Sequence, residues 1–230
     1  MNTKNLKPYI IVLISIFAMI FSSCSDNQGT VESIPYFKVS NEFANYCWFD
    51  SSSYWVFQDD TTLTIDTVSI SNVLVTKRFH TQPIDYNYQA VEMFISSNLF
   101  TFSEYELTAG NYEVADGEMN SLLRLYKSDG SYQLVFLPQY PFGEEVIMGD
   151  EIGTYTNIEK VNSFWLNDIE YSSVYHTRVV ITNNNSVEYD YWIAKNHGII
   201  KAVSNVNGQT SSVSLKSDKV INHIPGIIIN

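Results

Sequence analysis

Short apolar runs separated by turn residues constrain the fold of this chain more than any other feature of its sequence. After residue 34 no apolar pattern with the helical period continues for more than two turns. Runs rich in Val, Ile, Thr, Tyr and Phe recur instead, as in half-buried strands. We expect strands over residues 54–58, 63–70, 73–79, 88–96, 100–107, 122–127, 132–138, 154–161, 172–182, 187–194, 199–203 and 211–215.

The residues between these runs indicate how the strands connect. Ser-Asp-Gly-Ser at 128–131, Asn-Asn-Asn at 183–185 and Asn-Gly at 207–208 each separate two runs. Asn and Gly accept the positive φ angles of tight hairpin turns, and a hairpin makes its two strands antiparallel. The sequence therefore predicts a mainly β fold with few helices, in which consecutive hairpins form antiparallel sheets. A sandwich, an open barrel and a curved sheet all fit this pattern.

Composition supports a folded, acidic domain. Hydrophobic residues make up 45% of the 230 residues and charged residues only 17%, which is enough apolar surface for a core. The chain has 13 Lys and Arg against 25 Asp and Glu, and this negative field repels phosphate backbones, so we expect no nucleic-acid partner. Two cysteines exclude a disulfide scaffold and a four-cysteine zinc site.

The first 24 residues have the pattern of an export signal. Lys4 and Lys7 precede an apolar run over 9–21, which is shorter than the ~20 residues of a membrane-spanning helix. The run ends in Phe-Ser-Ser-Cys at 21–24, which resembles the lipobox of bacterial lipoproteins. That resemblance implies a signal peptide over 1–23 and acyl chains, such as palmitate, on Cys24. An uncleaved anchor helix and ordinary signal cleavage, with Cys24 unmodified, remain alternatives.

Residues 25–33 are small and polar, which predicts a flexible tether over 24–34 before a single antiparallel β domain over 35–230. The loop-like segment 139–153 marks a subdivision of that domain near residue 145 as an alternative. The segments YWVFQD at 54–59 and YWIAKNHGIIK at 191–201 resemble uncharacterised exported lipoproteins of the Bacteroidota type. This resemblance implies a lipid-anchored protein of the cell envelope, in the outer membrane, with the periplasmic and surface faces both open. It implies no established activity.

No catalytic motif is present in the sequence. There is no GxSxG, SxxK, P-loop or HExxH pattern, and the four His residues are scattered, so we expect no enzyme, catalytic residue, cofactor or metal centre. We expect Cys47, between aromatic residues, to be a small buried side chain. The acids Glu144, Glu145, Asp150 and Glu151 are weak candidates for a calcium site.

The aromatic content of 14% leaves some large rings for binding as well as for the core. The candidate ligand-binding residues are Trp55, Trp165, Trp192 and Tyr191. The leading hypothesis is a membrane-anchored lipoprotein whose β domain binds an envelope component without catalysis. The alternative is a carrier that holds a lipid or glycan in a concave, aromatic-lined cavity, and a third hypothesis is a hydrolase using the acids of 144–151. The expected partners are thus the membrane, through the N-terminal lipid, and an envelope protein, lipid or glycan.

Overall fold

The computed structural model of this chain describes residues 34–81, 85–97, 102–111, 120–147, 153–181 and 187–223. The chain divides into two units, Met1–Ile34 and Pro35–Asn230, and the fold given below is that of the second. The expected signal peptide, Cys24 and nearly all of the tether lie outside the described residues. Within the described ranges no helix has the length and apolarity to cross a membrane.

The described chain is almost entirely β-strand, with one helix, α2 (Asn41–Cys47). The strands are β1 (Tyr36–Phe37), β2 (Tyr54–Asp59), β3 (Ile65–His80), β4 (Tyr86–Ser96), β5 (Phe102–Asn111), β6 (Asn120–Lys127), β7 (Tyr132–Phe136), β8 (Glu145–Ile147), β9 (Gly153–Leu166), β10 (Ile169–Ile181), β11 (Val187–Ala194), β12 (Gly198–Val206) and β13 (Gln209–Lys219).

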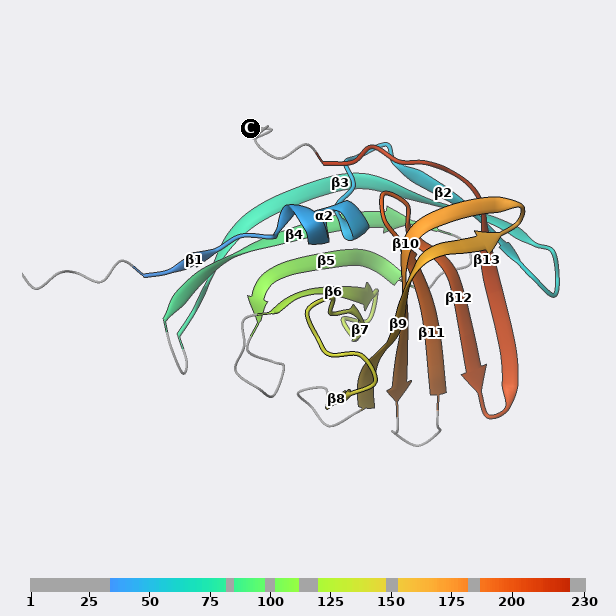
Figure 1. Ribbon diagram of the computed structural model, residues 1–230. Helices are drawn as coiled ribbons and strands as arrows, with labels where there is room; N and C mark the ends of the chain where they lie inside the picture. Colours follow the sequence, from blue (N-terminus) through green and yellow to red (C-terminus); the bar gives the residue numbers. More distant parts are fainter. Residues whose placement is uncertain are drawn as a thin grey trace, which may run out of the picture. The chain divides into compact units, whose positions relative to one another are not determined.

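The strands form one curved 13-stranded sheet in the order β7-β6-β5-β4-β3-β2-β13-β12-β11-β10-β9-β8, with β1 paired in parallel to β4 (Figure 1). Every pair along that order is antiparallel, and all but one join strands that are consecutive in sequence. The exception is β2 with β13, which unites a meander over β2–β7 with a meander over β8–β13. The prediction of a mainly β, antiparallel fold built from hairpins is confirmed, and the curved sheet is the form that it takes.

Turn chemistry places the hairpins where the sequence predicted them. Asn207 and Gly208 adopt φ angles of 53° and 81° between β12 and β13, and Gly130 adopts 84° between β6 and β7. The prediction of separate strands over 63–70 and 73–79 is wrong, because both belong to β3. A register shift between Ile70 and Asn72 lets that strand bend without ending.

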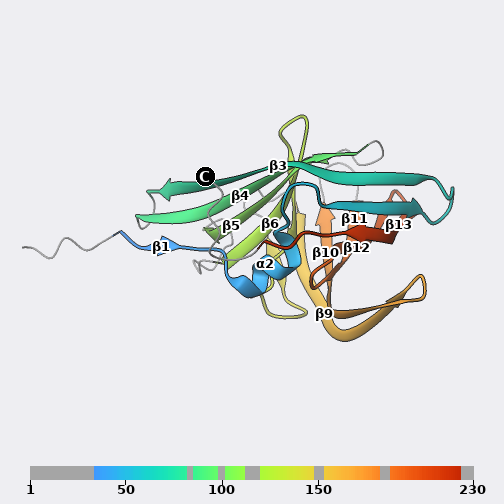
Figure 2. The same cartoon turned by 90° about the horizontal axis from the view of Figure 1, so that it is seen from above.

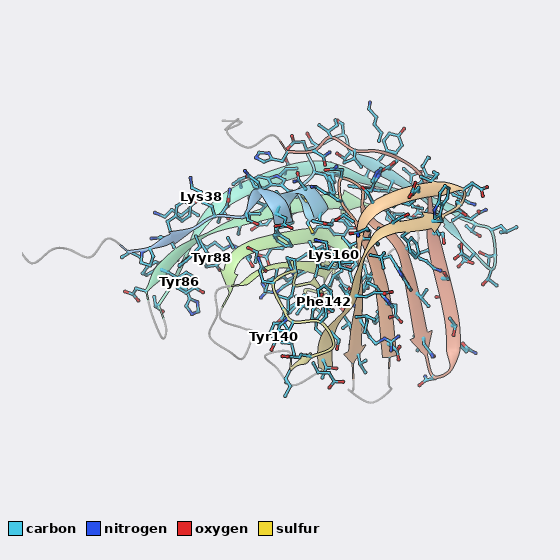
Figure 3. The ribbon with its side chains drawn as sticks, viewed as in Figure 1. Lys38, Tyr86, Tyr88, Tyr140, Phe142 and Lys160 are labelled. Atoms are coloured by element: carbon cyan, nitrogen blue, oxygen red, sulfur yellow. The ribbon has the colours of Figure 1, made fainter. Side chains whose placement is uncertain are left out.

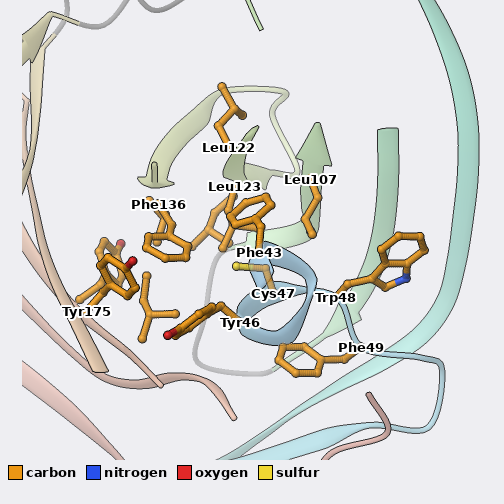
Figure 4. Packing of buried hydrophobic residues seen from close by; sticks show 14 of the residues in the cluster. Phe43, Tyr46, Cys47, Trp48, Phe49, Leu107, Leu122, Leu123, Phe136 and Tyr175 are labelled. Carbon is orange, nitrogen blue, oxygen red and sulfur yellow. The ribbon is translucent and has the colours of Figure 1, made fainter. Parts of the chain in front are cut away.

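Helix α2 packs on one face of the sheet, which we call the inner face (Figures 1 and 2). Ser40 caps the helix, since its Oγ accepts a hydrogen bond from the backbone N–H of Phe43 at 3.2 Å. Almost every apolar side chain from Phe43 to Phe49 is buried, and these side chains meet Leu107, Leu123 and Phe136 of the sheet (Figure 4). The helix therefore fills the space that the curved sheet encloses.

Edge strand β7 lies against β9 and β10, near the other end of the sheet, and among the described residues no backbone ladder pairs it with them. Side chains bridge the gap: Thr177 Oγ1 donates to the carbonyl of Val135 at 2.9 Å. The Leu137 N–H donates to the hydroxyl of Tyr155 at 3.0 Å, and Asn157 Nδ2 donates to the Leu137 carbonyl at 2.7 Å. This seam joins β7 to β9 and β10 and satisfies polar backbone groups that a closed barrel would pair in a ladder.

Candidate interaction surface on the outer face

The outer face of β10, β11 and β12 gathers charged and aromatic side chains in two rows. Strand register places His176 opposite Trp192, and Trp192 opposite Lys201. In the next row Arg178 is opposite Asp190. These residues point away from α2 because they alternate along their strands with buried residues of the core. We call the five residues the Trp192 surface.

Trp192 is held between its neighbours in this surface. The ring of His176 stacks on the indole with a centroid distance of 4.3 Å and an interplanar angle of 10°. Lys201 Nζ lies 5.1 Å from the indole centroid, and the ring of Phe164 lies 6.2 Å away. Neighbours of this kind cover the indole faces, so Trp192 offers a partner its edge and not an open stacking platform.

Asp190 connects the two rows through hydrogen bonds to one residue of each. Its Oδ1 lies 2.7 Å from His176 Nε2 and accepts a hydrogen bond from Arg178 Nε at 3.0 Å. Burial by itself would raise the pKa of Asp190, but the hydrogen bonds from His176 and Arg178 outweigh it, and the pKa lies below its usual value. The carboxylate is thus ionised at neutral pH, and it fixes the orientation of both neighbours.

The charged groups of this surface orient one another. His176 is hydrogen-bonded to Asp190, and its Nδ1 lies 3.9 Å from Glu159. Arg178 also pairs with Glu188 at 2.9 Å, so the surface is a network of mutually oriented charges. Such groups present directed donors and acceptors to a polar partner.

A hairpin next to this surface carries its most exposed aromatic residue. The turn between β9 and β10 has Asn167 and Asp168 at φ angles of 50° and 62°. Asn167 Nδ2 donates to the carbonyl of Leu215 on β13 at 2.8 Å, which fixes the hairpin tip against the sheet. Trp165, beside this turn, is 66% exposed, and Ile169 is 41% exposed. A rigid tip with solvent-facing apolar side chains is typical of an interface anchor.

The structure does not bring the four candidate ligand-binding residues together on one surface. Trp55 and Tyr191 are 3% and 4% exposed and belong to the core. The Trp55 indole N–H donates to the carbonyl of His197 at 2.6 Å, and the Tyr191 hydroxyl accepts from Gln133 at 3.0 Å. Trp192 lies on the outer face, and Trp165 is exposed at the β9–β10 hairpin.

The calcium candidates are divided by the limits of the described chain. Glu144 precedes β8 and Glu145 is its first residue, and both are exposed, whereas Asp150 and Glu151 lie outside the described residues. Among the residues that the structure places, no group of three or more His, Cys, Asp or Glu side chains is arranged to hold a metal ion.

Among the described residues, a small cavity lies on the inner face. A cavity of about 10 Å³ lies against Cys47 and Tyr105, beneath α2, and this is space for about one water molecule. Cys47 is buried as the sequence predicted, and burial raises the pKa of its thiol. Beside the seam, Lys160 Nζ lies 4.7 Å from the ring centroid of Tyr175, and Phe142 stacks on the same ring (Figure 3). Both residues thus pack on Tyr175, whose ring also contacts Tyr46 of α2.

Sequence reasoning missed His176, Arg178 and Asp190, although a usable signal was present. The Asn-Asn-Asn turn at 183–185 implies that a hairpin centred on residue 184 pairs positions equally distant from it. Counting outward from that centre pairs His176 with Trp192 and Arg178 with Asp190, as the structure does. The contacts of Phe164 and Lys201 with Trp192 do not follow from this count, because they depend on the bend of β9 and on the pairing of β12 with β11.

No family model matches the chain, and no curated protein matches it in sequence. A solved structure of a Bacteroides fragilis protein, described as exported and as having a YmcC-like fold, is similar to this chain at 11% sequence identity. The similarity covers 76% of this chain and 98% of that one, with a TM-score of 0.32. At that score neither fold nor function is carried over to this chain.

Proposed function

We propose that this protein is a cell-envelope lipoprotein, anchored in the outer membrane through acylated Cys24, whose β unit binds another envelope protein and catalyses no reaction. The anchor is supported by the two lysines, the short apolar run and the Phe-Ser-Ser-Cys segment at 21–24. Two or three acyl chains give stable attachment, whereas one chain gives marginal attachment.

The observation that carries the binding role is the outer surface at the β9–β10 hairpin. Trp165 is 66% exposed on a tip fixed by Asn167, and its neighbour Phe164 stacks on Trp192, which lies in the row next to that of Arg178 and Asp190. Interface hot spots are enriched in Trp and Arg, which fits a protein partner. The packing of α2 on the inner face favours this outer site over a carrier, because a lipid inside the sheet would have to displace the helix and its aromatic side chains.

The anchor is tested by replacing each cysteine in turn. Cys24→Ala should abolish acylation of the mature N-terminus, read by mass spectrometry, and release the processed protein from the membrane fraction. Cys47→Ala is the matched control, since Cys47 is buried in the core, and it should stay in the membrane fraction. Retention of processed Cys24→Ala protein in the membrane would refute the anchor.

The binding role is tested with a photoreactive amino acid at one of two exposed tips. At position 165 we expect a discrete protein adduct in intact cells. At position 63, where the native Leu63 is 64% exposed on the β2–β3 turn, we expect no such adduct. Glycan or lipid adducts at position 165 would replace the protein partner with that class of molecule. Equal labelling at both positions, or none at 165, would refute the proposed site.

A further inference from the structure

Beyond α2, the inner face of the sheet is continued by β1 and by the neighbouring ends of β3 and β4 (Figures 1 and 2). Strand register sets Phe79 of β3 and Tyr36 of β1 in one row, on either side of β4. Lys77 and Val75 follow along β3 on the same face, and Val75 is opposite the buried core residue Val91. What we call the Tyr36 patch consists of Tyr36, Lys38, Val75, Lys77 and Phe79.

The apolar side chains of this patch are open to solvent. Phe79 is 51% exposed, Val75 is 49% exposed and Tyr36 is 43% exposed. All three belong to paired strands, so the sheet holds them in place. Large apolar side chains that are exposed together on one face mark an interaction surface.

Two lysines gather on one ring of the patch. Lys38 Nζ lies 5.7 Å and Lys77 Nζ 5.3 Å from the centroid of the Tyr36 ring (Figure 3). Both lysines are exposed, and within the described chain neither forms an ion pair, not even with the exposed Asp85 before β4. Two ammonium groups without a carboxylate repel each other, and an anionic partner relieves that repulsion. The patch is thus positively charged in a chain whose net charge is −12.

Lysines beside exposed rings suit the surface of an anionic bilayer. Amphipathic rings such as that of Tyr lie at the level of the lipid headgroups, and lysines there bind phosphate while their stems lie along apolar surface. Tyr36 follows Cys24 by 12 positions. An extended chain covers at most about 3.4 Å per residue, so Tyr36 stays within roughly 40 Å of that cysteine. We infer that the Tyr36 patch docks on the anionic phospholipid surface of the membrane that holds acylated Cys24. This inference rests on the proposed lipid anchor.

Such a contact orients the anchored chain and does not replace its anchor. Two lysines and two exposed rings bind a bilayer weakly by themselves, but the covalent link to Cys24 keeps their local concentration high. The headgroups that attract the patch repel the acidic remainder of the chain. The β9–β10 hairpin lies at the opposite side of the β unit from β1 (Figures 1 and 2), so docking leaves Trp165 accessible to a partner.

The inference is tested with full-length acylated protein in vesicles of phosphatidylcholine, alone or mixed with phosphatidylglycerol. An environment-sensitive fluorophore on Thr81→Cys, an exposed position just past β3, reports lipid contact through quenching by spin-labelled lipid. Cys47 is buried and stays unlabelled. We expect at least threefold more quenching in the mixed vesicles than in phosphatidylcholine alone. The same fluorophore on Leu63→Cys, at the other end of β3, should be quenched weakly and equally in both.

Charge reversal separates the patch from the net charge of the chain. Lys38→Glu/Lys77→Glu should lower the quenching at position 81 to its level in phosphatidylcholine alone. Lys195→Glu/Lys219→Glu makes the same change in net charge outside the patch, and the quenching should persist. Equal loss in the two double variants would overturn the inference. Quenching at position 81 that never exceeds that at position 63 would overturn it as well.

Flotation of the same vesicles distinguishes the docking from the anchor. Protein that floats with the vesicles but shows no lipid contact at position 81 would overturn the docking and leave the anchor in place. Protein that does not float would overturn both.

A photoreactive amino acid at position 81 extends the test to intact cells. We expect phospholipid adducts at this position. A discrete protein adduct without phospholipid would overturn the inference and assign the Tyr36 patch to a protein partner.

Discussion

The backbone N–H of Leu137 donates a hydrogen bond to the hydroxyl of Tyr155 at 3.0 Å, across the seam where the sheet fails to close as a ladder. Asn157, two residues further along β9, holds the carbonyls of Leu137 at 2.7 Å and Tyr140 at 2.9 Å. Tyr155 and Asn157 are both fully buried. Tyr155 and Asn157 of β9, together with Thr177 of β10, thus hydrogen-bond backbone groups at the seam in place of a ladder.

The seam predicts a large stability effect at Asn157. Asn157→Ala should lower the free energy of unfolding by about 2–3 kcal/mol, because it removes the donor to the buried carbonyl of Leu137. Urea denaturation followed by circular dichroism measures the change. Asn162→Ala, at an exposed position of the same strand, should change it by less than about 0.5 kcal/mol. Equal losses in the two variants would contradict the role of the seam.

Substitution of Gly198 should be costly, for a reason that only the tertiary structure shows. Its φ of 77° is unfavourable for any other residue, and an added Cβ would lie 3.0 Å from the Phe49 ring. Gly208 has a similar φ of 81°, with open space around it. Gly198→Ala should therefore cost about 1–2 kcal/mol more than Gly208→Ala in thermal unfolding. Equal costs would mean that the contact with Phe49 relaxes freely.

The carboxylate of Glu106 is buried with cationic partners on the outer face. Arg78 and Arg124 form ion pairs with it, and the Tyr126 hydroxyl donates to it at 3.0 Å. Glu106→Gln should cost about 3 kcal/mol, since the cations lose their compensating charge. Glu42→Gln, whose side chain is 77% exposed and pairs with Lys160 at 3.8 Å, should cost at most about 1 kcal/mol in the same urea titration.

Glu104 is expected to oppose folding at neutral pH. Burial raises its pKa, and the negative charges of Glu92 and Glu106 raise it further. A carboxyl whose pKa is higher in the folded state is penalised wherever it is ionised in both states. Glu104→Gln should therefore raise the urea midpoint at pH 7. This gain should disappear as the pH falls through the raised pKa to below 4.5, the ordinary value.

The control for this prediction is Glu145→Gln, which removes an exposed carboxylate from β8. Its urea midpoint should follow that of the unmodified protein across the same pH range. A gain for Glu104→Gln that persisted unchanged at pH 4 would show that repacking, and not the charge of the carboxylate, stabilises the variant.

Local sequence was sufficient for the strands that end at recognisable turns. Residues 187–194 were predicted with the bounds that β11 has, because Asn-rich and Gly-containing turns stand at both ends. Helix α2 and the short β8 were not predicted. Seven residues make a marginal helix in water, and α2 is stabilised by the packing of Phe43 and Tyr46 against the sheet.

Of the candidate site, the sequence identified the large aromatic residues but not their roles. Trp55 and Trp165 each lie in a strand rich in aromatic or apolar residues, yet one is in the core and the other is exposed. Burial depends on which elements cover a strand, and a period of two residues shows only which side chains share a face.

The sequence by itself determined the antiparallel hairpins and the strand register around their turns, because φ preferences and alternation act over a few residues. Only the tertiary structure decided that β2 meets β13, that α2 fills the inner face, and that Tyr155 and Asn157 join the seam. These contacts link residues far apart in the chain. Each forms only when the apolar surface that it helps to bury outweighs the entropy of closing the loop between its partners.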